Sequence, residues 1–326
     1  MSRPATPLRI GTRSSALALW QTERIRELLR NAGCETERVE IKTTGDLAPE
    51  VPLARLGSRA IFTKQIDDAL SQGRVDLAVH SLKDLPTQLP AEISIGAIGP
   101  REDPRDALVG RTRLRWNDLS DSAVVATSSL RRRAQLLHLR PMARVVELRG
   151  NVDTRLAKLD AHPEWHAIIL ATAGLVRLGL ERRIGERLPV DVILPAPGQG
   201  ALAVTVRSND EAVSATVREA VHEPDVAIAV AAERAFLRRL EGGCQVPVAA
   251  YAEPTREAGR ASLRLHGRVV SLDGETMIEG MEVGTVGDEE AAVALGSVLA
   301  ERLLAEGAGS ILTDARAASL PTVTEP

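Results

Sequence analysis

Apolar residues recur along this chain at two different spacings. Residues 8–11 form a short strand-like stretch, Leu-Arg-Ile-Gly, and the apolar positions 17, 20, 25, 28 and 29 that follow recur at helical spacing as far as Gly33. A short run predicts a strand, whereas the second pattern predicts an amphipathic helix with Ser15 at its start and glycine at its end. The first two expected elements are therefore a strand at 8–11 and a helix at 15–31.

The same alternation continues over most of the chain and then changes character. A helix is expected at 62–72, after a surface loop at 45–59 in which prolines and glycines interrupt any period. Further strands are expected at 39–43, 75–79, 123–126, 145–148, 167–171, 201–206, 248–252, 263–270 and 277–283, and an Ala-rich helix at 288–305. Strands joined by crossover helices indicate an α/β protein, here in two parts with a hinge near 100–104, followed by a small α+β domain.

Composition and charge narrow the class of protein. Of the 326 residues, 44% are hydrophobic and 26% charged, and the formal net charge is −3. These values are ordinary for a globular protein and argue against a nucleic-acid or membrane-surface protein. The longest apolar run, near 167–176, is too short to cross a bilayer, and no apolar leader precedes the first strand. We expect a soluble cytoplasmic protein.

Cysteine and histidine positions exclude several kinds of site. Cys34 and Cys244 are the two cysteines, and their wide separation fits neither a disulfide framework nor paired zinc ligands. The six histidines show no metal-ligand spacing, so no metal is expected. Cys244 is unusual because it follows two glycines on a corner, whereas a packing cysteine usually sits in an apolar run.

A first basic cluster, residues 126–133, follows one of the expected strands. The strand ends at Ala126 and a helix is expected to start at Ser129, so free backbone N–H groups, hydroxyls and guanidinium groups can converge on one anion. The candidate anion-binding residues are Thr127, Ser128, Ser129, Arg131 and Arg132. A capped amphipathic helix with a solvated basic face would show the same pattern, so both interpretations stay open.

A second basic cluster, residues 147–155, repeats the arrangement. A strand end is followed by a turn at Gly150 and a helix start, with Arg149 and Arg155 on either side. Arg13 and Ser15, at the end of the first strand, can add a third set from the other half of the chain. Two such clusters in one domain suggest a ligand with several negative charges, because the arginine fork holds a carboxylate bidentately.

A polar segment, residues 80–86, follows the strand expected at 75–79. It contains Ser81, Lys83 and Asp84 and lies at the carboxyl edge of the sheet, where α/β proteins bind ligands. Asp84 can cap or salt-bridge locally, or it can be the acid that stabilises positive charge or exchanges a proton in a cation-lined cleft. By contrast, the Gly198–Ala203 segment is a turn and not a dinucleotide fingerprint, because prolines precede it and a strand pattern follows.

Seven motifs in this order carry a resemblance over nearly the full length of the chain. They are RIGTRSS at 9–15, DLAVHSLKDLP at 76–86, REDPRD at 101–106, TSSLRR at 127–132, LRGNV at 148–152, ATAGL at 171–175 and EGGCQVP at 241–247. The sequence resembles the porphobilinogen deaminase family, also called hydroxymethylbilane synthases. Several long motifs in the correct order make this resemblance specific.

The resemblance implies a transferase with a covalent cofactor. Cys244 would hold a dipyrromethane cofactor through a thioether, and the glycine corner would let the thiolate reach its electrophile. Four porphobilinogen molecules would be added to this primer, each losing ammonia, before water releases linear hydroxymethylbilane. Asp84 would stabilise the cationic azafulvene formed as ammonia leaves and would help to move the proton.

The resemblance also implies which residues bind the carboxylates of the pyrroles. Lys83 would bind a side-chain carboxylate of the cofactor, Gln199 would contact the cofactor, and Phe62 would stack on a pyrrole or pack in the core. The remaining binding residues would be Arg13, Ser15, Ser81, Thr127, Ser128, Ser129, Arg131, Arg132, Arg149, Gly150 and Arg155.

The family architecture implied by the resemblance agrees with the expected segments. It consists of two α/β domains that are similar to periplasmic binding proteins and a small α+β domain with the cysteine. We expect the first domain at 1–99 and 200–218, the second at 105–194 and the third at 222–313. Porphobilinogen is the expected partner, and a monomer without nucleic acid or membrane contacts is implied.

The chain departs from the family pattern near its expected loop. Arg55 and Arg59 stand where lysines are usual, Ala60 where glycine is common, and Gln65 replaces a frequent glutamate. The arginines keep the charge, but an alanine restricts the backbone more than a glycine. A different class of protein, a two-domain binding protein for a small anionic ligand, would share the basic clusters and the hinge without needing Cys244.

Overall fold

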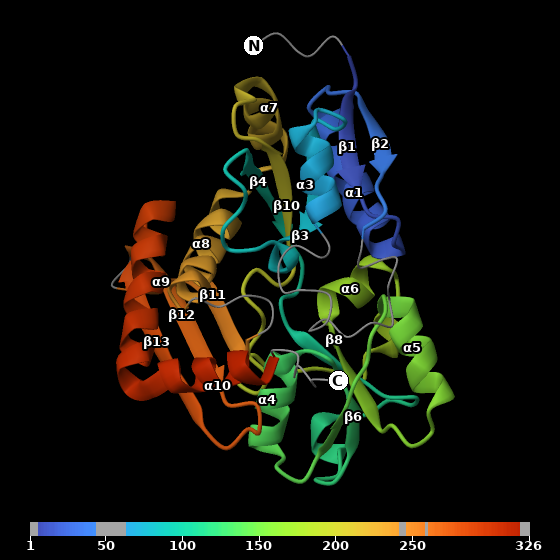
Figure 1. Cartoon of the computed structure of the whole chain (residues 1–326), viewed down its shortest axis with the longest axis vertical. Coiled ribbons are helices and arrows are strands. Elements are labelled where there is room, and N and C mark those ends of the chain that lie inside the picture. The colour runs from blue at the N-terminus through green and yellow to red at the C-terminus, as the bar shows by residue number, and fades with distance from the viewer. Residues whose placement is uncertain (1–5, 44–62, 241–245, 258–259, 320–326) are drawn as a thin grey trace, which may run out of the picture.

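The computed structural model describes residues 6–43, 63–240, 246–257 and 260–319, and three sheets organise this part of the chain (Figure 1). The first sheet has the strand order β2-β1-β3-β10-β4. Its strands are β1 (Leu8–Thr12), β2 (Thr36–Glu40), β3 (Leu77–Ser81), β4 (Ile93–Arg101) and β10 (Ala201–Arg207). β1 pairs in parallel with both neighbours, whereas β10 runs antiparallel between β3 and β4.

Helices cover both faces of the first sheet. α1 (Ala16–Asn31) and α7 (Glu211–Val221) share one core with the strands, and α3 (Lys64–Ser71) packs in a separate core on the other face. Val204 and Val206 on β10 belong to the first of these cores. The strands are therefore buried on both sides, as expected for an α/β sheet.

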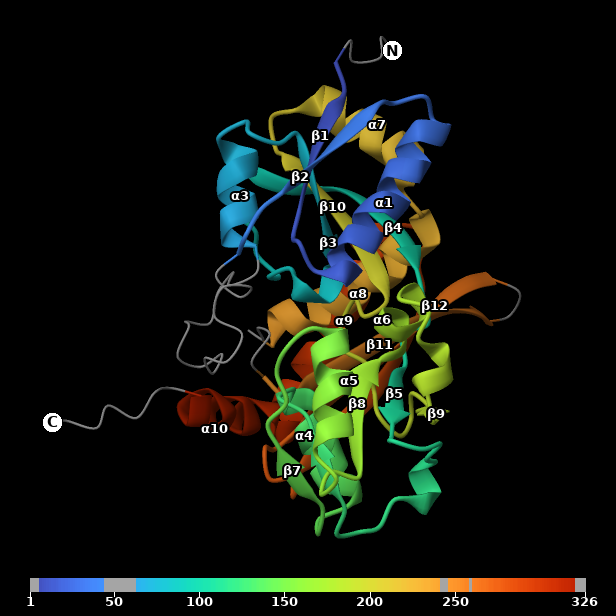
Figure 2. The same ribbon diagram turned by 90° about the vertical axis from the view of Figure 1, so that its right-hand side faces the viewer.

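The second sheet has the order β7-β6-β8-β5-β9 and lies below the first in Figure 2. Its strands are β5 (Asp106–Val109), β6 (Val124–Ala126), β7 (Arg144–Val146), β8 (Ala167–Ala171) and β9 (Glu186–Arg187). α4 (Leu130–Leu139) shares a core with Leu108 and Ile169, while α5 (Val152–Ala161) and α6 (Thr172–Arg177) pack with Ile168 and Leu170. Successive strand residues thus serve opposite faces, because side chains alternate along a strand.

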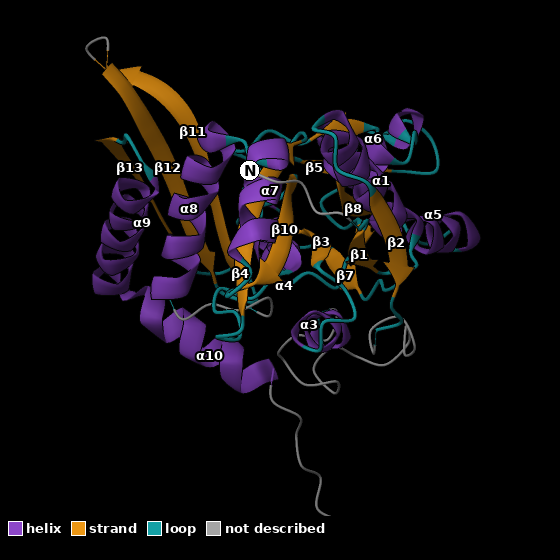
Figure 3. Cartoon of the chain, turned by 90° about the horizontal axis from the view of Figure 1, so that it is seen from above, coloured by secondary structure: helices purple, strands orange, loops and turns teal. Residues whose placement is uncertain are grey.

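The third sheet is antiparallel and small. It consists of β11 (Val248–Glu257), β12 (Arg260–Val270) and β13 (Met277–Thr285). α8 (Pro224–Arg239) and α9 (Glu289–Leu303) lie side by side against it, as Figure 3 shows, and α10 (Gly309–Ser319) follows. Phe236 on α8 is fully buried over Gly267, where a Cβ atom would lie 2.5 Å from its ring. A glycine is required at this point of β12 by that close approach.

Two chain crossings join the first and second sheets, and they lie next to each other. One is the end of β4 with Glu102, and the other is the segment 195–200 before β10; the amide of Glu102 donates to the carbonyl of Gly200 over 3.0 Å. Gly200 has φ of +89°, and a Cβ there would collide with the carbonyl oxygen of Glu102. The buried carboxylate of Glu233 on α8 accepts from Arg101 (2.8 Å) and from the amide of Gly198 (2.6 Å). The third unit, which consists of β11–β13 with α8, α9 and α10, therefore contacts both crossings.

The predicted fold class is confirmed, with differences in detail. The two α/β sheets are mixed and not purely parallel, because β10 and β5 run against their neighbours. The sequence pattern did not predict β4 or β5, and β2 begins at Thr36, earlier than the expected 39–43. β2 is an edge strand whose side chains are mostly exposed, so its apolar pattern is weak. The turn predicted for Gly198–Ala203 is confirmed at Gly198 and Gly200, which both have positive φ, whereas Ala201–Ala203 already belong to β10.

Among the described residues, no helix has both the length and the apolar character needed to cross a bilayer. Cys34 is buried in the core of the first sheet, which agrees with a structural role.

Candidate functional site

Two adjoining cavities lie where the three units meet. The larger, of about 660 Å³, is lined from the first sheet by Arg13 and Ser15 and from the second by Arg149 and Arg155. The smaller, of about 200 Å³, is lined also by α8 and β11 of the third unit. Four residues border both cavities: Lys83, Asp84, Ser129 and Arg132.

The polar segment after β3 lies at this junction. A short helical turn, η2 (Leu82–Asp84), begins where β3 ends, so Lys83 and Asp84 leave the sheet at its carboxyl edge. Ser81 Oγ accepts from Gln21 on α1 (2.7 Å), and Lys83 Nζ donates to Gln199 Oε1 (3.2 Å). Burial lowers the pKa of Lys83 to about 8, although the carboxylate of Asp84 acts in the opposite direction. This arrangement agrees with the prediction that Ser81, Lys83 and Asp84 lie at the carboxyl edge of the sheet.

The hydroxyl groups of the first basic cluster mainly organise its backbone. Ser129 caps α4, because its Oγ accepts from the amide of Arg132 (3.4 Å). Ser128 Oγ donates to the carbonyl of Leu148 (2.8 Å) and accepts from its amide (3.0 Å), which ties the two basic clusters together. Thr127 is buried, accepts from the amide of Ser129 (3.2 Å) and lines neither cavity.

Arg131 and Arg132 are buried and share one carboxylate. Arg131 Nη1 donates to Asp106 Oδ2 over 2.7 Å, and Arg132 donates to Oδ1 through Nη2 (2.7 Å) and Nε (3.1 Å). Gln199 Nε2 also donates to Oδ1 (3.0 Å). Burial by itself would raise the pKa of Asp106, but the two guanidinium groups hold that pKa well below its usual range. Because both arginines are only 5% exposed, the interpretation of a solvated basic face does not apply to them.

The second basic cluster holds guanidinium atoms that have no acceptor among the described residues. Asn151 caps α5 by accepting from the amide of Thr154 (2.9 Å), and Gly150 turns the chain with φ of +117°. Arg149 Nη1 and Arg155 Nε are buried atoms without a hydrogen-bond partner among the described residues. Burial lowers the pKa of Arg155 to about 10, still leaving it charged at neutral pH. Buried donors of this kind indicate an acceptor from outside the described residues, either a water molecule or an anion.

The larger cavity is strongly cationic. Among its described lining residues Asp84 is the only acid, and the cations are Arg13, Lys83, Arg132, Arg149, Arg155, Lys158 and Arg177. A ligand in this space must therefore be an anion, and one with several charges, because a single charge could not neutralise the walls.

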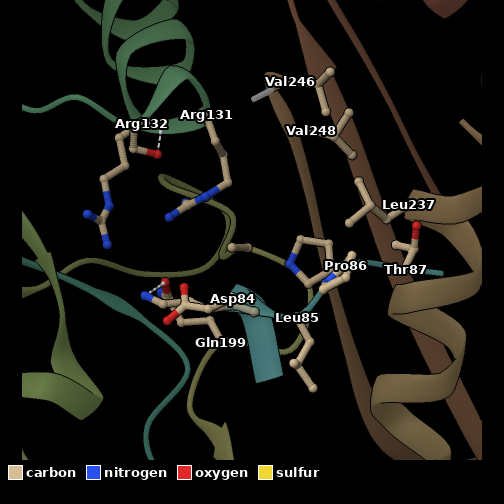
Figure 4. A pocket seen from close by; sticks show the side chains of 14 residues that line it. Asp84, Leu85, Pro86, Thr87, Arg131, Arg132, Gln199, Leu237, Val246 and Val248 are labelled. Atoms are coloured by element: carbon tan, nitrogen blue, oxygen red, sulfur yellow. Dashed lines mark hydrogen bonds between the residues drawn. The ribbon is translucent and has the colours of Figure 1, made fainter. Parts of the chain in front are cut away.

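The smaller cavity has two chemically different walls, which Figure 4 shows from close by. Arg131 and Arg132 reach in from α4, and Leu237, Val246 and Val248 of the third unit lie on the other side. Asp84 and Gln199 lie below the two arginines in this view. The cavity can thus hold a molecule with an apolar body and carboxylates at one edge.

Several predicted residues lie outside the described part of the chain. These are Cys244, Phe62 and the loop positions Arg55, Arg59 and Ala60. The chain resumes at Val246, which lines the smaller cavity. Gln65 lies on α3 near a shallow pocket beside Lys42, away from the cavities of the site.

The sequence of the chain matches two models of known protein families. The model described as porphobilinogen deaminase, dipyromethane cofactor binding domain, matches residues 8–215, and the model of the C-terminal domain of porphobilinogen deaminase matches residues 227–305. The chain belongs to the porphobilinogen deaminase family. Its seven motifs were the correct signal, and the predicted family is confirmed.

Curated porphobilinogen deaminases resemble this family member over almost its whole length. The protein of Moorella thermoacetica is 48% identical over 314 residues, which are 96% of this chain and 97% of the relative. The protein of Rubrobacter xylanophilus is 50% identical over 93% of this chain and 95% of the relative. These relatives give no support to the alternative of a binding protein for a small anion.

Solved binding proteins are similar to this member of the porphobilinogen deaminase family at a lower level. A nutrient binding protein from Burkholderia cenocepacia bound to methionine is 13% identical with a TM-score of 0.44, and covers 68% of this chain and 93% of the binding protein. A periplasmic substrate-binding protein of an ABC transporter from Coxiella burnetii is 16% identical with a TM-score of 0.41, over 67% and 93%.

Sequence reasoning missed four residues of this family member's site. Asp106 was quoted within a motif but given no role, and Gln21, Lys158 and Arg177 were not considered. The signal for Asp106 was a carboxylate at the start of an otherwise apolar strand, which is costly unless the charge is paired. Lys158 could have been found one helical turn after Arg155, on the same face of α5.

Proposed function

We propose that this chain catalyses the stepwise head-to-tail condensation of four porphobilinogen molecules and then releases hydroxymethylbilane. Each condensation forms one carbon–carbon bond and expels one ammonia, and a final water completes the product. Membership of the family supplies the transferase activity and the dipyrromethane cofactor. The observation that carries the assignment of residues is the cationic cavity with a single described acid at its junction with the smaller cavity.

The substrate chemistry matches the walls of the larger cavity. Porphobilinogen carries an acetate and a propionate, so every added unit brings two further carboxylates into the cleft. Arg149 and Arg155 offer buried donors without another described partner, and Arg13 and Ser15 face them from the first sheet. Each charge-assisted hydrogen bond contributes about 1.5–3 kcal/mol, so the growing chain stays bound although its charge increases.

The buried donors also suit the carboxylates of a dipyrromethane group. We assign its attachment to Cys244 and its carboxylate contacts to Lys83, Arg131 and Arg132, which line the smaller cavity. When bound, the group supplies the pyrrole carbon on which chain growth starts. Leu237 and Val248 keep water away from its apolar parts, and Gln199 is held next to it by Lys83 and Asp106.

Asp84 is the group that we assign to charge stabilisation and proton movement. It is exposed towards the junction of the cavities, where Lys83 donates to Gln199 and Arg132 pairs with Asp106. A carboxylate in this position stabilises the positive charge that develops on the pyrrole as ammonia leaves, and it can carry the proton lost from the attacked ring. Ser81, Thr127, Ser128, Ser129 and Gly150 are assigned a supporting role, since they shape the backbone around these groups. For Phe62 we propose stacking on a pyrrole, with packing in the core as the alternative.

Intact mass spectrometry of the purified protein tests the proposal. We expect the mass of the polypeptide plus two pyrrole units, and a shift back to the polypeptide mass in a Cys244→Ser variant. A Cys34→Ser variant is the matched control, because that cysteine is buried in a core and should leave the added mass unchanged. A wild-type protein that weighs only its polypeptide but still converts porphobilinogen would contradict the proposal.

The proposal includes the wider setting of the enzyme. We assign it to the cytoplasm and to a monomeric state, with domains at 1–99 and 200–218, at 105–194 and at 222–313. Widely separated cysteines, one of them buried, support a reducing compartment. The three sheets support the division into domains, since each has its own hydrophobic core.

A further inference from the structure

Arg268 is a buried arginine of the third unit that makes its main contacts with the second. It lies on β12, and its Nη1 donates to Gln135 Oε1 on α4 over 2.8 Å. Its Nη2 donates to the carbonyl of Asp191 (3.0 Å), while Nε donates to Glu279 on the neighbouring strand (2.7 Å). Arg268 is 5% exposed and Gln135 is 2% exposed, so the hydrogen bond between them is shielded from water.

Gln135 continues this contact towards the cleft. Its Oε1 accepts from the amide of Leu194 (2.8 Å), and its Nε2 donates to the carbonyl of the same residue (3.1 Å). That carbonyl also accepts from Arg131 Nη1 over 2.7 Å, and the same nitrogen donates to Asp106. Direct hydrogen bonds therefore lead from Arg268 through Gln135 and Leu194 to a guanidinium group that lines the smaller cavity.

We propose that Arg268 is a positioning residue that fixes Arg131 in the cleft through Gln135 and the carbonyl of Leu194. The third unit, whose residues Val246 and Val248 line the same cavity, would thereby set the place of a cation on the opposite wall. Coupling by this route is strong because every group in it is buried. A buried polar group that loses one partner must turn to find another, and its neighbours then move as well.

The competing explanation is that Arg268 only ties the third unit to the second. In that case its loss would lower stability without moving Arg131. The two explanations differ in the state of the Arg131 guanidinium, which can be measured directly in the holoprotein as its rate of modification by phenylglyoxal, read from the masses of peptides.

The test compares Arg268→Gln with Arg264→Gln. Both arginines lie on β12, but Arg264 makes an exposed pair with Glu253. We expect Arg131 to be modified at least about tenfold faster in Arg268→Gln than in the wild type, and no change in Arg264→Gln. Because Arg131 is assigned to a carboxylate of the primer that accepts porphobilinogen, kcat/KM should fall about tenfold, as expected when one charge-assisted hydrogen bond is weakened.

Gln135→Met provides a second route to the same result, because it keeps the size of the side chain and removes its polar atoms. It should match Arg268→Gln in both measurements, and it replaces that variant if Arg268→Gln does not fold. If Arg131 stays protected and kcat/KM is unchanged while the melting temperature falls, Arg268 is a structural tie and the inference is wrong. The kinetic measurement rests on the proposed function, but the modification rate of Arg131 does not. Failure of this inference is therefore distinguishable from failure of the proposed function.

Discussion

Asp106→Asn tests whether one buried carboxylate holds the two arginines of the first basic cluster. The substitution keeps the shape of the side chain and removes its charge. Asp106 is fully buried and accepts four hydrogen bonds, from Arg131, Arg132 and Gln199, at 2.7–3.1 Å. The amide nitrogen of asparagine would face either Arg131 or Arg132 with a donor in place of an acceptor, and two buried guanidinium groups would lose their counter-charge.

Removing one partner from a buried ion pair costs about 3–5 kcal/mol. For this 326-residue chain, unfolding as a whole, each kcal/mol lowers the melting temperature by about 2–4 °C, so a decrease of about 6–20 °C is expected. Asp103→Asn is the matched control, since Asp103 pairs with Arg105 and Arg187, whose side chains are about 40% exposed. Exposed pairs of that kind contribute about 1 kcal/mol or less.

Thermal unfolding followed by circular dichroism measures both variants, and acid titration adds an independent check. Because the pKa of Asp106 in the folded state lies below its unfolded value of about 4, its contribution to stability is complete above that pH and is lost as the pH falls further. Asp106→Asn should therefore be less sensitive to acid than the wild type. The reasoning is refuted if Asp106→Asn melts within the range of Asp103→Asn and keeps the acid profile of the wild type.

Three further predictions concern single positions. Asp84→Asn should retain the fold and the added mass but lose about 100-fold or more in kcat, and undiminished turnover would remove Asp84 from the mechanism. His80 is buried against Thr205 (3.1 Å), and burial lowers its pKa to about 4. The free energy of unfolding should therefore fall by up to about 3 kcal/mol as the pH decreases from 6.5 to 4. Urea titrations should show a weaker pH dependence of this free energy in His80→Gln, and an equal pH dependence would exclude His80 as its source. Gly150→Ala should lower the free energy of unfolding by about 1–3 kcal/mol and slow cofactor assembly, because φ is +117° and the new Cβ would lie 2.6 Å from Thr154. Thermal melts and intact masses equal to those of the wild type would show that the turn tolerates a side chain.

Local sequence patterns were sufficient for the parts of the site that are built from neighbouring residues. Ser15 and Ser129 were recognised as helix starts, and both cap the helices that follow them. The strand ends before Ser81 and Thr127 were placed correctly to within about two residues, because apolar runs and polar turns alternate clearly there. Motif order was sufficient for the family, since a motif is itself a local pattern.

Contacts between distant segments could not be read from these patterns. Asp106 on β5 meets Arg131 and Arg132 on α4, and no periodicity of 2 or 3.6 residues relates positions 25 apart. β10 enters the first sheet antiparallel between β3 and β4, a placement that follows from which faces must be buried together.

The sequence by itself therefore determined the family, the class of fold, and the helix and strand ends that carry the basic clusters. Tertiary structure alone determined which cations already have an internal partner, such as Arg131, and which have buried atoms without a partner in the described part of the chain, such as those of Arg149 and Arg155. The physical reason is that charge neutralisation and burial depend on distance in space, and the pairing of β5 with β8 and the packing of α4 on their sheet set those distances only after folding.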